Sequence, residues 1–285
     1  MNGNSLKIVL MLVTVIFLFG CEEMVSDVDA PESLPKLVVT GFITPGMPYT
    51  AVTVKKSRPL YTTIDNYGSD FPTVEDAYVT ISDGIDSAYL TYDIEYDSYR
   101  VSREELPIVP GRVYTLKVTA PGGYEVEATC TVPSDTPPDI ELVKIDTTIV
   151  NESINLNASI KFKDLESADN YYGITAGIVN WHEGQMNPVI TEIGFARGEP
   201  YVSDKNMNNQ YFSYSTNDFY YFSGETQRLF FTIAVTDVHY YNYHKVLYNY
   251  EGVNPFAEPT KLYSNIRNGL GVFAAYILKG VAYDL

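Results

Sequence analysis

The sequence has 285 residues, with 36 Asp and Glu against 19 Lys and Arg, so its formal net charge is −17. This acidity argues against a nucleic-acid-binding protein, because neutralising phosphates requires clustered lysines and arginines. Hydrophobic residues make up 45% of the chain and charged residues 19%, which allows a sizeable folded core. The 25 tyrosines and 13 phenylalanines favour strands, so we expect a mostly β protein.

The N-terminus has the pattern of a bacterial lipoprotein signal. Lys7 precedes an apolar run of 12 residues, 8–19. A membrane-spanning helix needs about 20 residues, so this run fits the core of a signal peptide. Residues 18–21 (LFGC) resemble a lipobox, which is cleaved before its cysteine. We therefore expect residues 1–20 to be removed and Cys21 to be acylated, which anchors a protein stably when two or more chains are attached. An ordinary secretory signal with an incidental cysteine is the alternative.

An acidic segment follows the cysteine. Residues 21–35 carry five acidic side chains, two prolines and no lysine or arginine, which predicts a solvated tether. Acidic residues directly after a lipidated cysteine also resemble the surface-export signal of Bacteroidota lipoproteins. Lipidation of Cys21 would leave Cys130 as the remaining cysteine, so no intrachain disulfide is expected.

Residues 36–133 are expected to form an immunoglobulin-like β-sandwich. Short strand patterns alternate with turn signals, and the clearest hairpin joins residues 113–120 to residues 124–132. Apolar and polar residues alternate along both strands, which indicates one buried and one solvent-facing side. Cys130 falls on the apolar side, so we expect it to be a core residue. The spacing of the strands is typical of a sandwich.

A second β-rich, sandwich-like domain with one helix is expected over residues 139–285. Three prolines within residues 133–139 mark the boundary. The helix is expected near 238–251, capped by Asp237 and ended by Gly252. We expect its apolar stripe to pack on a sheet, with a partner-binding helix as the alternative. The stripe consists of Tyr240, Tyr243, Leu247 and Tyr250.

Motifs for catalysis or metal binding are missing from the sequence. His239 and His244 are five residues apart, whereas a helical zinc pair needs four, and no zinc, nucleophile-elbow or phosphate-loop motif occurs. Residues 204–209 (DKNMNN) start like a calcium loop, but Asn209 replaces the required glycine and Ser215 the final glutamate. We therefore expect a polar surface loop there, no metal, no cofactor and no enzymatic activity.

An aromatic-rich segment is the candidate ligand-binding site. Seven aromatic residues lie within twelve positions, interleaved with Ser, Asn and Asp. Rings with polar groups suit contacts with sugars, peptides or proteins, and the alternative is that they fill the core of their own hairpin. The candidates are Tyr211, Phe212, Tyr214, Phe219, Tyr220, Tyr221 and Phe222.

The chain resembles a family of Bacteroidota outer-membrane lipoproteins, DUF4249. Besides the lipobox and tether, the resemblance lies in residues 75–84 (EDAYVTISDG), 110–116 (PGRVYTL), 254–259 (NPFAEP) and 264–275 (SNIRNGLGVFAA). Members are often encoded beside SusC-type TonB-dependent transporters, and the family has no established catalytic residues. The resemblance implies a non-catalytic accessory lipoprotein of a nutrient-uptake complex, on the cell surface, that binds the transporter, its ligand or both. The alternative is a surface module that binds an oligosaccharide or peptide directly.

Overall fold

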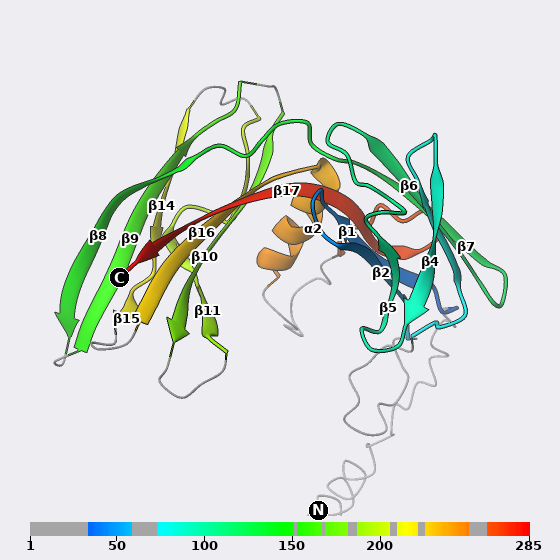
Figure 1. Ribbon diagram of the computed structural model, residues 1–285, viewed down its shortest axis with the longest axis horizontal. Helices are drawn as coiled ribbons and strands as arrows, with labels where there is room; N and C mark the ends of the chain where they lie inside the picture. Colours follow the sequence, from blue (N-terminus) through cyan, green and yellow to red (C-terminus); the bar gives the residue numbers. More distant parts are fainter. Residues whose placement is uncertain are drawn as a thin grey trace, which may run out of the picture. The chain divides into compact units, whose positions relative to one another are not determined.

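The computed structural model describes residues 34–58, 73–150, 153–166, 169–181, 187–205, 210–221, 226–250 and 261–285 (Figure 1). The predicted signal peptide, Cys21 and the tether up to residue 33 lie outside these residues. All elements described below belong to one compact unit, residues 35–58 and 65–285. The described part is mostly β, with two sheets and one helix, which confirms the predicted fold class.

The N-terminal half is a sandwich in which one strand belongs to both layers. Strand β4 pairs through residues 87–90 with β3 and through residues 91–93 with β5. The predicted hairpin is confirmed, because β6 and β7 pair from Ala120 opposite Tyr124 onward. The strands are β1 (Leu37–Ile43), β2 (Tyr49–Lys56), β3 (Tyr78–Ser82), β4 (Ser87–Asp93), β5 (Ser98–Ser102), β6 (Val113–Ala120) and β7 (Tyr124–Thr131).

The core of this half comes from the alternating apolar positions of its strands. Cys130 lies in that core as a buried free thiol, as the alternation predicts. Three residues far along the chain, Ile266, Phe273 and Ala275, are buried in the same core. The N-terminal half therefore depends on the C-terminal segment for part of its interior. The largest buried side chains include Leu37, Ile43, Ile81, Leu90, Tyr99, Tyr114, Leu116 and Phe273.

The C-terminal half is a second pair of packed sheets. Its core contains residues of β9 and β14 from one sheet and of β10 and β16 from the other. The strands are β8 (Ile140–Val150), β9 (Ser153–Lys163), β10 (Tyr171–Trp181), β11 (Val189–Ile193), β12 (Phe195–Arg197), β13 (Tyr201–Ser203), β14 (Tyr211–Thr216), β15 (Phe219–Tyr221), β16 (Thr226–Thr236) and β17 (Leu270–Asp284).

Strand β17 connects the two halves. Its residues 270–275 pair in parallel with β1, and its residues 276–284 pair antiparallel with β16. Figure 1 shows this strand, in red, running from beside β1 to beside β16. Because one continuous sheet passes through both halves, the predicted division into domains 36–133 and 139–285 stays a prediction.

A glycine permits the close pairing at the start of β17. Gly271 has φ +105°, and a Cβ atom there would collide with the carbonyl oxygen of Val39, its partner in β1. Only glycine adopts this backbone conformation without strain. The parallel pairing of β1 with β17 therefore depends on this residue.

The helix α2 (Val238–Tyr248) begins as predicted and ends three residues earlier. The side chain of Asp237 caps it by accepting a hydrogen bond from the backbone N–H of Tyr240 at 2.8 Å. The predicted stop, Gly252, lies outside the described residues. Within the predicted stripe, the rings of Tyr240 and Tyr243 contact Phe42 of β1, whereas Leu247 and Tyr250 are exposed. No helix in the described ranges is long and apolar enough to cross a membrane.

Candidate functional site

The aromatic segment chosen from the sequence mostly faces the interior. Tyr214 and Phe219 are buried in the core of the C-terminal half, and Phe212 and Tyr221 pack against it. Phe222 lies outside the described residues. The remaining two rings are exposed, Tyr211 by 54% and Tyr220 by 62%.

These two exposed rings lie far apart on their sheet. Tyr211 pairs with Lys163 and Tyr220 pairs with Asn155, both on β9. Eight residues separate those partners, which corresponds to roughly 26 Å along a strand. The structure therefore does not bring the six described rings together at one surface site, and a ligand-binding role for the segment stays a prediction.

A different group of aromatic side chains gathers on the outer side of the N-terminal half. The rings of Tyr78 and Tyr89, 59% and 49% exposed, are stacked with their centroids 5.0 Å apart. The guanidinium of Arg100 lies 4.3 Å from the ring centroid of Tyr49 and 4.1 Å from that of Tyr96. We call these five residues the tyrosine surface.

The strand alternation explains why these rings face solvent. In β3, Val79 and Ile81 enter the core, so Tyr78 points outward. In β4, Leu90 enters the core, so Tyr89 and Thr91 point outward. Thr91 pairs with Arg100, and it lies about 7 Å along β4 from Tyr89. The stacked pair and the arginine cluster therefore adjoin each other along β4, on either side of the point at which this strand passes from one layer to the other.

The chemistry of the tyrosine surface suits binding. Tyrosine offers a large contact area at low entropic cost, and both tyrosine and arginine are enriched at protein interfaces. The Arg100 guanidinium is held by the Asp93 carboxylate at 3.0 Å, so it is fixed in position between its two rings. The sequence analysis did not identify this surface. The signal that could have identified it is the tyrosines at strand positions that alternate with the buried apolar ones and therefore face solvent.

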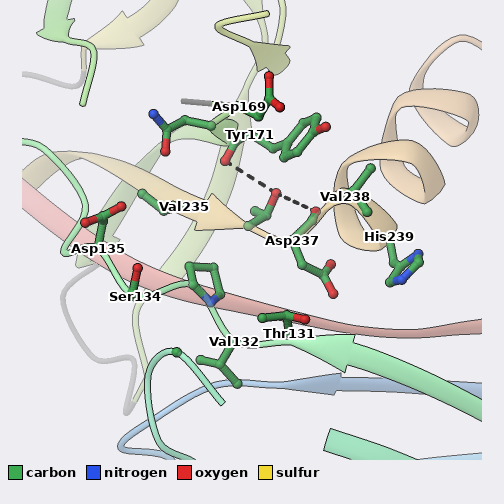
Figure 2. Close-up of a pocket in the computed structure, with 14 residues that line it drawn as sticks. Thr131, Val132, Ser134, Asp135, Asp169, Tyr171, Val235, Asp237, Val238 and His239 are labelled. Carbon is green, nitrogen blue, oxygen red and sulfur yellow. Dashed lines mark hydrogen bonds between the residues drawn. The ribbon is translucent and has the colours of Figure 1, made fainter. Parts of the chain in front are cut away.

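A cavity of about 600 Å³ lies next to the N-terminus of α2 (Figure 2). Asp237 is 8% exposed, and burial raises the pKa of its carboxyl to about 6, although nearby backbone N–H groups, led by that of Tyr240, lower it in part. Nδ1 of His239 lies 2.6 Å from the hydroxyl of Tyr263, and burial lowers the pKa of this histidine. The cavity is lined by residue 111 and by residues 131–135, 169–171 and 235–239.

In the segment that starts like a calcium loop, the first candidate ligand, Asp204, is hydrogen-bonded within the protein. Both carboxylate oxygens of Asp204 accept hydrogen bonds from Asn170, one from its backbone N–H at 2.8 Å and one from Nδ2 at 3.0 Å. Residues 206–209 lie outside the described part, and Ser215 is hydrogen-bonded to Ser159. Among the described residues, no three His, Cys, Asp or Glu side chains are grouped to hold a metal ion.

Fold and surface together define a strand-built protein with two hydrophobic cores, one shared strand and an outward-facing aromatic surface. The chain belongs to the family described as "Domain of unknown function (DUF4249)", which matches residues 23–277. This confirms the family predicted from the sequence. The search of curated proteins finds no match to this chain.

Proposed function

We propose that this protein is a non-catalytic outer-membrane lipoprotein that acts as an accessory subunit of a TonB-dependent nutrient-uptake complex. In this role it binds the transporter, its ligand or both. The observation that carries the proposal is the tyrosine surface, because its four rings, two against a fixed arginine and two stacked on each other, are exposed and have no role in the core. The lipobox at Cys21 and the transporter association implied by the family resemblance support it.

Anchoring at Cys21 would keep the tyrosine surface close to the membrane. Residues 22–35 form the predicted tether between the lipidated cysteine and the sandwich, and fourteen residues span at most about 46 Å. A tether of this length restricts the protein to the zone in which an outer-membrane transporter exposes its loops. Restriction to this zone raises the effective concentration of the two partners, so a modest interface is sufficient.

The test is affinity purification of the tagged, full-length protein from outer membranes of its native host in mild detergent. We expect the wild type to recover a TonB-dependent transporter and the double variant Tyr78→Ala/Tyr89→Ala to recover at least tenfold less. The matched control is Tyr211→Ala/Tyr220→Ala, which also removes two exposed rings, but from the C-terminal half. Wild-type protein that recovers no transporter across several mild detergents contradicts the proposal.

The second candidate is a module that binds an oligosaccharide or peptide directly. The stacked pair Tyr78 and Tyr89 favours it, because two exposed stacked rings offer an apolar surface for a ligand. Calorimetry of the purified protein against oligosaccharides and peptides separates the two functions. The binding module is supported over the transporter subunit by two results together. A ligand binds the wild type but not Tyr78→Ala/Tyr89→Ala, and the affinity purification recovers no transporter.

A further inference from the structure

The cavity beside α2, which we call the junction cavity, lies where segments of both halves meet. The end of β7 and the chain that follows it supply residues 131–135, the start of β10 supplies residues 169–171, and the end of β16 with the start of α2 supplies residues 235–239. Its volume of about 600 Å³ is in the range of small-molecule sites. None of its lining residues belongs to the tyrosine surface.

One buried oxygen in this cavity lacks a partner. Oδ1 of Asp237 caps α2, whereas Oδ2 is buried and accepts no hydrogen bond of regular geometry within the part of the chain that the structure describes, although the backbone N–H groups of Thr131 and His239 lie near the carboxylate. Figure 2 shows the carboxylate turned away from Tyr171 and toward Thr131. Buried polar atoms normally have a hydrogen-bond partner, because leaving one unpaired costs free energy. A ligand that donates a hydrogen bond would remove that cost.

The charge of the lining indicates which donor fits. Three lining residues are carboxylates, Asp135, Asp169 and Asp237, and none of the lining residues is a lysine or arginine. His239 also lines the cavity, and burial lowers its pKa, which favours the neutral ring. The cavity is therefore negative, which favours a cationic ligand.

The residues that line the cavity also favour an organic cation over a metal ion. A metal ion needs several ligating side chains around it, and the described residues offer no group of three. A protonated amino group has three donors and is satisfied by one carboxylate with hydroxyl or carbonyl oxygens. Thr131 and Ser134, which carry hydroxyls, also line the cavity, and Figure 2 shows Thr131 next to the Asp237 side chain.

We propose that the junction cavity binds the protonated primary amino group of a small ligand, such as an alkylamine or a short lysine-containing peptide, and that Oδ2 of Asp237 accepts its hydrogen bond. Binding there is independent of the proposed transport role. It would also link the two halves, because the ligand contacts residues of both.

The test measures binding of 1,5-diaminopentane by calorimetry to the full chain at pH 7.5, with 1,5-pentanediol as the uncharged probe of the same length. We expect the diamine to bind and the diol to show no heat of binding. Asp237→Asn removes the charge but keeps a good helix cap, and we expect it to weaken diamine binding at least tenfold. Glu95→Gln removes one exposed charge away from the cavity and should bind as the wild type does.

Equal binding of the diol and the diamine to the wild type overturns the proposal, and so does a diamine affinity unchanged in Asp237→Asn. The proposal is also overturned if Glu95→Gln weakens diamine binding as much as Asp237→Asn does, because that result indicates attraction to the overall negative charge. The comparison of the two probes needs only the wild type, so it can overturn the proposal even where Asp237→Asn does not fold. The absence of any heat with the diamine contradicts the proposal as well.

Discussion

Ala275 and Tyr276 are consecutive residues of β17, yet Ala275 pairs with Ile43 of β1 and Tyr276 pairs with Thr236 of β16. The direction of pairing changes between them from parallel to antiparallel. A single strand thus contributes to the core of the N-terminal half before this point and packs along the C-terminal half after it. We infer that the two halves unfold together, because neither keeps all of its strands without β17.

Truncating a core residue of β17 tests this coupling. Phe273 is fully buried in the core of the N-terminal half, so Phe273→Ala should lower the free energy of unfolding by about 3–5 kcal/mol. The unfolding curve in urea, followed by circular dichroism, should remain a single transition. Leu278→Ala in the same strand is the control, since Leu278 is half exposed and its loss should cost below about 1 kcal/mol. Two separate transitions in the Phe273→Ala variant would argue against coupled halves.

The glycine at the start of β17 gives a second prediction. Gly271→Ala places a methyl group against the carbonyl of Val39 at a backbone conformation that alanine rarely adopts. We expect a fall of more than 10 °C in Tm or loss of folded protein. Gly280→Ala, in the same strand, is the matched control, because the nearest atoms would lie 3.7 Å from its new methyl group. Similar Tm values for the two variants would show that the close approach at Gly271 is unimportant.

Asp237 predicts a pH dependence of stability. Burial raises the pKa of its carboxyl from 3.8 to about 6, so the unfolded chain loses this proton first as the pH rises. The protonated carboxyl therefore contributes about 3 kcal/mol to the free energy of unfolding. This contribution is complete below pH 3.8 and is lost as the pH rises through 6.

The comparison with Asp237→Asn isolates this effect. The variant should gain about 2.4 kcal/mol of stability relative to the wild type between pH 4 and pH 7.5. The neighbouring His239 and Cys130 are present in both proteins, so their own titrations cancel in the difference. Urea unfolding of both proteins at the two pH values gives the measurement. A stability difference that does not change with pH would mean that Asp237 titrates normally.

The free thiol of Cys130 gives a prediction about reactivity. It is buried, and burial raises its pKa well above the ordinary value for a thiol. The thiolate is the reactive form, so we expect folded protein to resist alkylation at pH 8 and to react fully once unfolded in urea. Intact mass before and after iodoacetamide treatment measures this. Rapid labelling of Cys130 in the folded protein would contradict its place in the core.

Sequence patterns over short stretches of the chain were sufficient to predict much of the fold. The alternation from Tyr114 to Ala120 and from Tyr124 to Val132 predicted the hairpin and the buried position of Cys130. The cap of α2 was also predictable, because Asp237 precedes the helical pattern and aspartate is a preferred cap. These features depend on residues close together in the chain.

Long-range pairing was not predictable. Alternation gives the face on which a residue lies but not its partner, so nothing in residues 270–275 identifies β1 as their neighbour. The segment 211–221 has rings on both faces of its strands, so the sequence could not show which ones face solvent. The tyrosine surface is assembled from β2, β3, β5 and neighbouring strands, and only the fold brings Tyr49, Tyr78 and Arg100 to one side.

The most direct test of the central claim is site-specific photo-crosslinking in living cells of the native host. A photoreactive phenylalanine analogue replaces Tyr89 in the tyrosine surface or, as the control, Tyr220 in the C-terminal half. After irradiation, mass spectrometry of the purified adducts identifies the partner. We predict that position 89 crosslinks to a TonB-dependent transporter and that position 220 does not. Finding no transporter adduct at position 89, with both proteins correctly lipidated at Cys21, would contradict the account.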